Sequence, residues 1–176
     1  LIDGQLFAYI DKHELLSGSC MDERLSPNYH LVVNYLNRFT QWVAYQVLCK
    51  ENAQERQKAL LWFLEVAKYC VRFNNYNTSY ILFGALSLHS VARINETRSV
   101  TRTASMWKKL TTLFDPRRNF AEYRKQLDKV SVSGFAVPIL GLIPRDIVRF
   151  EMDPTYSPQE WIEFDKMRGI YYVVQS

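Results

Sequence analysis

The feature that most limits how this chain folds is an asparagine-rich corner, Phe73-Asn74-Asn75-Tyr76-Asn77. The corner has neither Gly nor Pro, and it separates two long apolar segments of helical period. Asparagine tolerates left-handed backbone, and its side chain caps helices. We therefore predict a tight connection between two helices, with Asn77 capping the second.

Apolar residues at helical spacing continue on both sides of the corner. Ser26-Pro27 supplies a cap and a proline for the first position of a helix that runs to about Cys49. Asn52 and Glu55 form a capping box for a helix to about Arg72. This helix is apolar almost all round, which predicts a central, buried element.

Helical patterns also fill most of the second half of the chain. Asn119 and Glu122 form another capping box, and Ser157 with Glu160 starts a last helix. Residues 95–105 are polar and without period, so we expect a loop there. Because strand alternation is confined to short runs, the sequence predicts an all-α fold in one domain over residues 1–176.

Composition limits the classes of function. The chain has 176 residues, a formal charge of +4 and a pI near 8.9. This mildly basic balance does not indicate nucleic-acid binding. The excess is local, since residues 93–125 hold nine Lys or Arg against three Asp or Glu. A solvated loop or a surface facing an acidic partner or membrane would explain it.

The cysteine pattern indicates a reducing compartment. Cys20, Cys49 and Cys70 are odd in number and widely spaced, which favours reduced, buried thiols in the cytoplasm. No metal-ligand spacing is present, and no apolar run is long enough to span a membrane. The chain lacks an initial Met and starts within a pattern, so we expect a domain excised from a longer protein.

Motifs for bond-making chemistry are missing from the sequence. The six glycines never cluster, so neither a dinucleotide fingerprint nor a P-loop is present. No nucleophile elbow occurs, and the carboxylates form no obvious acid–base pair. We therefore expect a binding or remodelling protein that needs no cofactor, rather than a conventional enzyme.

The asparagine corner resembles the (L/F)NN(F/Y)N signature of the catalytic domain of Ras-type guanine-nucleotide exchange factors. Two further pieces follow the order of that family. Leu36-Asn37-Arg38-Phe39-Thr40-Gln41-Trp42-Val43 is similar to its FNxxxxWV, and Val137-Pro138-Ile139-Leu140-Gly141-Leu142 to its PFLG(I/L/M) run. Weaker likenesses run from Leu1 to Gln175, and they include Arg56, Tyr123-Arg124 and Ile162–Arg168.

The resemblance implies a bowl of about eight helices that grips a Ras-family small GTPase, with a protruding helical hairpin at about 143–175. In that family the hairpin displaces switch I from the nucleotide, and other helices hold switch II. Nothing in the chemistry requires a metal or cofactor of the chain's own. Membrane recruitment is then expected through regions that flank the chain.

The resemblance also places candidate residues. Val148 matches the apolar wedge of the hairpin, and Glu151 is the nearest carboxylate. Ser87, Asn119 and Phe120 match positions that grip the GTPase, although Phe120 would equally suit the core at the start of its helix. Structural roles are expected for the remaining motif residues, which are Asn37, Trp42, Arg56, Asn74, Asn75, Tyr76, Asn77 and Tyr123.

One departure from the family pattern concerns the hairpin. The family often has an acidic pair after its wedge, whereas here Met152 takes the position of the functional acid. Glu151 or Asp153 would substitute after a shift of register. Without such a substitute, the alternative is a non-exchanging interaction module on the same fold.

Overall fold

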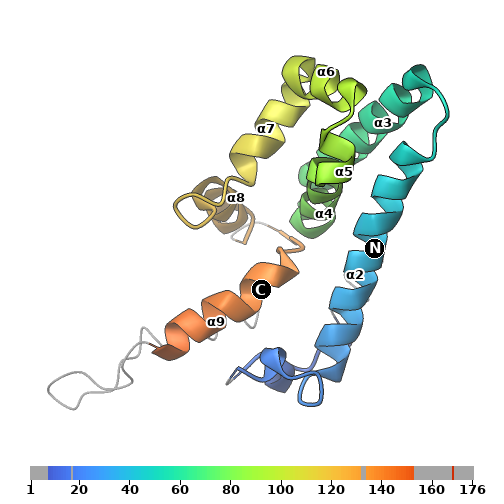
Figure 1. Cartoon of the computed structure of the whole chain (residues 1–176). Coiled ribbons are helices and arrows are strands. Elements are labelled where there is room, and N and C mark those ends of the chain that lie inside the picture. The colour runs from blue at the N-terminus through green and yellow to red at the C-terminus, as the bar shows by residue number, and fades with distance from the viewer. Residues whose placement is uncertain (1–7, 17, 132–133, 153–167, 169–176) are drawn as a thin grey trace, which may run out of the picture. The chain divides into compact units, whose positions relative to one another are not determined.

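The computed structural model of the chain describes residues 8–16, 18–131, 134–152 and 168. Two compact units emerge, one formed by Leu1–Asn34 with Ile139–Ser176 and the other by Tyr35–Pro138. Over the described residues the regular structure is helical apart from one isolated bridge between Asn75 and Val137. The all-α prediction is therefore confirmed (Figure 1).

Short helical turns and one longer helix make up the first unit. Its elements are η1 (Lys12–Glu14), η2 (Ser19–Met21), the start of α2 (Pro27–Leu48), η3 (Leu140–Leu142) and α9 (Ile143–Met152). Pro144 is tolerated because it lies in the first turn of α9, where a helical N–H has no partner to lose. The predicted last helix at Ser157 lies outside the described residues.

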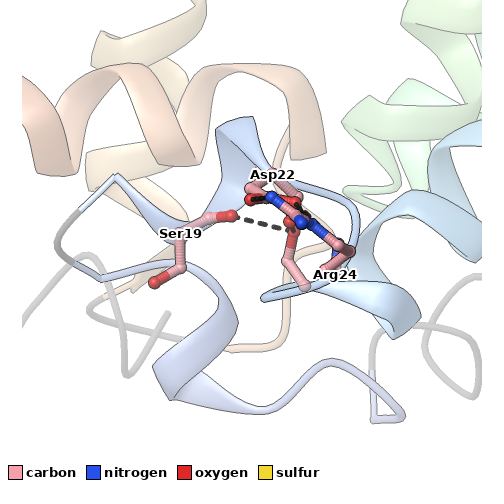
Figure 2. Close-up of polar contacts among 4 residues, drawn as sticks. Ser19, Asp22 and Arg24 are labelled. Carbon is pink, nitrogen blue, oxygen red and sulfur yellow. Dashed lines mark hydrogen bonds and ion pairs between the residues drawn. The ribbon is translucent and has the colours of Figure 1, made fainter.

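The start of α2 is capped differently from our prediction. The Ser26 hydroxyl lies 3.0 Å from the carbonyl oxygens of both Ser19 and Asp22, so it acts as a donor to the preceding turn. In the same turn, Arg24 folds back onto Asp22 (Figure 2). Glu14 supplies the cap instead, because its buried carboxylate accepts from the Tyr29 amide at 2.8 Å.

The second unit is built around α3. It comprises the rest of α2, α3 (Ala53–Arg72), α4 (Tyr76–Ser87), α5 (His89–Ala92), α6 (Asn95–Thr103), α7 (Ser105–Leu113) and α8 (Ala121–Ser131). Helix α3 contacts α4, α6 and α7, and α7 contacts α8. The long helices α2 and α3 begin and end within a residue or two of the prediction.

Burial of α3 is narrower than its sequence suggested. Leu60, Phe63 and Leu64 are buried on one face, but Leu61 and Trp62 are exposed. The prediction of a central, buried helix therefore holds for one face of α3 and not for the other. Residues with large apolar side chains occupy the outer face as well as the inner one, and composition alone does not separate the two faces.

In the asparagine corner, only residues 73–75 separate the end of α3 from the start of α4. Asn74 has a φ of 57°, and the amides of Asn74 and Asn75 donate to the carbonyls of Val71 and Cys70 at 3.0 and 2.8 Å. This pair of bonds is a Schellman motif, with Asn74 in the left-handed position that glycine usually takes. The Asn75 side chain then accepts from the Thr78 amide at 3.0 Å and caps α4.

The prediction that Asn77 caps α4 is therefore wrong. The helix starts two residues earlier than expected, and Asn77 is buried within its first turn. The corner is braced from outside by the segment after α8, since Val137 donates to the Asn74 carbonyl at 2.9 Å and accepts from Tyr76 at 3.0 Å.

Residues 95–103 form α6, so the predicted loop at 95–105 is also wrong. Val100 and Thr97, one helical turn apart, are buried in the unit. The Glu96 carboxylate, whose side chain is 13% exposed, pairs with Arg56 of α3 at 2.6 Å. Arg56 also donates to the Lys50 carbonyl at 3.0 Å. These tertiary contacts stabilise a helix whose own sequence is polar.

The three thiols are free, but they differ in exposure. Cys20 is buried, Cys70 is half-buried and Cys49 is exposed. Burial raises the pKa of the Cys20 thiol above its usual range. The expectation of buried thiols therefore fails at Cys49, which lies just after the last residue of α2.

Removing the cap of α4 tests the role of Asn75. We expect Asn75→Ala to lower the free energy of unfolding by about 1 kcal/mol, because the Thr78 amide loses its acceptor. Asn37→Ala is the matched control, since Asn37 is exposed on α2 and should change stability little. Urea titrations followed by circular dichroism give both values, and equal losses in the two variants would contradict the assignment.

The Arg56–Glu96 pair generates a pH-dependent prediction. A hydrogen bond from its own backbone amide and the Arg56 guanidinium lower the pKa of Glu96. The pair is therefore fully formed above the ordinary carboxyl pKa and is lost as the pH falls through the lowered value. We expect Glu96→Gln to cost about 1–3 kcal/mol at neutral pH.

The stability difference between Glu96→Gln and the wild-type chain should then shrink as the pH falls from about 7 to about 3. Glu122→Gln serves as the control, because Glu122 is an exposed helical glutamate without an ion pair among the described contacts. A difference for Glu96→Gln that stays constant over this range would show that its charge does not contribute.

Candidate functional site

Two of the three residues expected to grip a partner lie in the turn between α7 and α8. Arg118, Asn119 and Phe120 have φ values of 53°, 55° and 57°, so three successive residues are left-handed. Arg124 of α8 holds this turn, because its Nε donates to the Asn119 carbonyl at 2.8 Å and its Nη2 to Asn119 Oδ1 at 3.4 Å.

The predicted capping box at Asn119 and Glu122 is corrected by this geometry. Helix α8 begins at Ala121, and Phe120, not Asn119, immediately precedes it. The first helical bond runs from the Arg124 amide to the Phe120 carbonyl at 3.0 Å. A left-handed turn of non-glycine residues costs free energy, and the Arg124 contacts are among those that compensate for it.

Phe120 packs into the unit. It is 6% exposed, and its ring lies 6.1 Å from the ring of Tyr80 on α4. Tyr80 also meets Phe114 at 5.3 Å between centroids. Of the two roles open to Phe120 from the sequence, this burial favours core packing over direct stacking on a partner.

Ser87, the third candidate, lies at the exposed end of α4. Its hydroxyl donates to the Phe83 carbonyl at 2.7 Å, and the Phe83 ring packs on Trp107 and Phe114. Because Tyr80, Phe83 and Ser87 share one helical face, α4 connects Ser87 to the aromatic cluster beneath Phe120. The candidates of the second unit thus belong to one packed neighbourhood.

The motif residues Tyr76 and Tyr123 lie in the interior of the second unit. Both are buried, and their rings meet edge to face at 5.4 Å. Burial raises the pKa of Tyr76 above its usual range. These two tyrosines join the start of α4 to α8.

We expected Asn37 and Trp42 to lie in the core, but neither residue is buried. Asn37 is exposed, and Trp42 is 48% exposed although it stacks on Phe39 and meets Phe63 edge to face. Both residues lie beside the buried stripe of α2 that contains Val43 and Val47.

Helix α9 carries the residues expected at the wedge. Ile147 is buried, whereas Val148 and Glu151 are half-buried. Met152 is 81% exposed and lies one turn after Val148 on the same face. Val148 therefore lies at the border between the buried and exposed faces of α9. Asp153 lies outside the described residues.

In the described part of the chain, no group of three or more His, Cys, Asp or Glu side chains is arranged to hold a metal ion. Helices in those same ranges do not combine the length and apolar character needed to cross a bilayer.

Comparison with known proteins identifies the family. The RasGEF domain model matches residues 1–168, which is nearly the whole chain. The chain belongs to the RasGEF domain family. The family predicted from the asparagine corner and the two motifs around it is thereby confirmed.

Similar proteins carry names that agree with this RasGEF assignment. The chain is 29% identical to Ras guanine nucleotide exchange factor D of Dictyostelium discoideum over 99% of its own length. It is 30% identical to factor J of the same organism over 97%, and 29% identical to a Rap guanine nucleotide exchange factor of Caenorhabditis elegans over 97%. These matches cover 26%, 22% and 12% of the relatives, so the chain spans about a quarter or less of their length.

Sequence reasoning missed two charged residues whose contacts hold local structure in this RasGEF domain. Arg124 was expected only as part of a YRxxL-like motif, yet it holds the left-handed turn at Asn119. Glu14 was not singled out, although it caps α2. Both residues have charged neighbours in the sequence, so no local pattern singles them out.

Truncating Phe120 tests its packing role. We expect Phe120→Ala to lower the free energy of unfolding by about 3–5 kcal/mol, because it leaves a cavity beside Tyr80. Phe135→Ala is the matched control, since Phe135 is almost fully exposed in the described segment. Thermal and urea unfolding measure both variants, and an unchanged stability for Phe120→Ala would assign the ring to partner contact alone.

Proposed function

We propose that this RasGEF domain binds a Ras-family small GTPase and accelerates release of its GDP. Membership of the family supports the proposal, as do the names of the relatives, which include Ras and Rap exchange factors. The activity rests on binding rather than on bond-making chemistry. A cytoplasmic location, with recruitment to the membrane through flanking regions, is part of the same proposal.

The physical basis is linkage between two binding equilibria. A GTPase that holds its nucleotide with a picomolar Kd has about 16 kcal/mol of binding free energy to overcome. An exchange factor loosens this grip only by binding the nucleotide-free form more tightly than the loaded form. An interface on the order of 2,000 Å² or more is expected.

Within this proposal, α9 and the hairpin it begins displace switch I, and the second unit holds switch II. Val148 is the apolar wedge, and Glu151 or Asp153 supplies the carboxylate. Ser87 and Asn119 offer polar contacts to the partner. Phe120 acts by fixing the turn that presents Asn119, since its own ring is buried.

A second candidate function is a RasGEF-fold module that binds a partner without releasing nucleotide. Met152 motivates it, because an exposed thioether stands where the family pattern often has an acid. Such a module would form a complex with a GTPase or adaptor while GDP release stays at the intrinsic rate.

Loss of fluorescent GDP from a panel of Ras, Rap and Ral proteins decides between the two functions. We expect acceleration on at least one member of the panel when the folded domain is added at high concentration. A complex without acceleration on any member would support the non-exchanging module, and neither binding nor acceleration would contradict both functions.

Two substitutions on α9 sharpen this test. Val148→Asp should abolish acceleration, because it places a charge where an apolar side chain is proposed to enter the partner. Met152→Glu should increase acceleration, because it restores the acid of the family pattern on an exposed position. Arg149→Asp, also exposed on α9, is the control for charge. Thermal unfolding establishes that each variant is folded, and equal rates in all four proteins would refute the wedge.

A further inference from the structure

A groove in the second unit lies between α7, α8 and the end of α3 and has a volume of about 420 Å³. The apolar residues that line it include Val71, Met106 and Leu113, and we call them its floor. We call it the α7–α8 groove. Its volume falls within the range of pockets that bind small ligands.

The α7–α8 groove lies on a different side of α7 from the aromatic cluster beneath Phe120. Trp107 and Phe114 face α4, where their rings pack on Phe83. Met106 and Leu113 line the groove. None of Ser87, Asn119, Phe120 or Val148 lines it, so the groove is separate from the proposed GTPase contacts.

Charge on the rim of the groove is asymmetric. Lys108 and Lys109 of α7 line one side, and Glu122 and Gln126 of α8 line the other. Both lysines are exposed, and neither has an ion pair within 4.0 Å among the described residues. They belong to the segment in which nine basic residues face three acidic ones. The groove is therefore complementary to a ligand that has apolar side chains next to carboxylates. The apolar side chains would contact the floor, and the carboxylates would contact Lys108 and Lys109.

We propose that the α7–α8 groove docks a short peptide segment of a partner protein, with apolar side chains on the floor and acidic residues beside Lys108 and Lys109. A peptide fits better than an anionic membrane, because the site is a concave groove with an apolar lining rather than a flat charged surface. The inference goes beyond the proposed exchange activity and does not depend on it.

Fluorescence anisotropy with a labelled probe peptide, Asp-Glu-Asp-Leu-Glu-Asp-Leu-Leu, tests the proposal on the folded chain. We expect saturable binding that weakens as salt is added. Two control peptides separate the contributions: one has Asn and Gln in place of the acids, and the other has Ser in place of the leucines. Both controls should bind at least tenfold more weakly than the probe.

Variants of the groove give predictions of opposite sign. Lys108→Glu with Lys109→Glu should weaken probe binding tenfold or more, and Glu122→Lys should tighten it. Met106→Ser tests the floor and should weaken binding without a change in charge. The matched control is Lys58→Glu with Lys125→Glu, since both residues are exposed and neither lines the groove.

Each other outcome would overturn the proposal. No saturable binding of the probe, or equal loss in the control double variant, would mean that no specific peptide site exists. Binding to phosphatidylserine vesicles that needs Lys108 and Lys109, without binding of the peptide, would assign the surface to membranes. Thermal unfolding of every variant excludes loss of the fold. GDP release measured in parallel keeps a failure here distinct from a failure of the exchange activity.

Discussion

The connection between α3 and α4 in the second unit depends on the hydrogen bonds made by Asn74 and Asn75. A helix that ends leaves carbonyls without partners, and one that begins leaves amides without partners. The amides of Asn74 and Asn75 donate to the last carbonyls of α3 in a Schellman motif. The Asn75 side chain then accepts a hydrogen bond from the Thr78 amide in the first turn of α4. Because only residues 73–75 separate the two helices and their backbone groups are hydrogen-bonded, the direction of α4 is fixed relative to α3. The segment at Val137 then adds a bridge to the same corner and ties the chain after α8 to it.

The sequence predicted the parts of this fold that local patterns control. The all-α class, the extents of α2 and α3 and the corner itself followed from apolar period and asparagine chemistry. The position of the cap did not, because Asn74, Asn75 and Asn77 are chemically identical and only the backbone decides which one becomes left-handed. Helix α6 was missed for a different reason. Its polar sequence is stabilised by buried Val100 and by the Arg56–Glu96 pair, and both are contacts between segments far apart in the chain.

The candidate site shows the same division between local pattern and tertiary context. The motifs placed Ser87, Asn119 and Phe120 at a GTPase contact, and the structure brings the latter two into one turn beside α4. No pattern predicts three successive left-handed residues, because propensity disfavours them and only packing and the Arg124 contacts compensate. The burial of Phe120 likewise depends on Tyr80, which lies forty residues earlier. Under the proposed function, Phe120 would therefore contribute to binding indirectly, through the shape of the turn.

A surface that pries a nucleotide from its partner has to be stiff, since a compliant surface would deform before the partner does. The second unit meets this condition near the candidate residues, where Arg124 fixes Asn119 and the aromatic cluster fixes Phe120. On α9, Ile147 anchors the helix while Val148 lies at the border of the buried face, so the proposed wedge projects from a packed base. Under the same proposal, the exposed Met152 would change the charge beside the wedge and leave the packing of Ile147 unchanged. A chain with an intact scaffold and a missing charge should retain its partner while losing rate, and for this reason binding and release have to be measured separately.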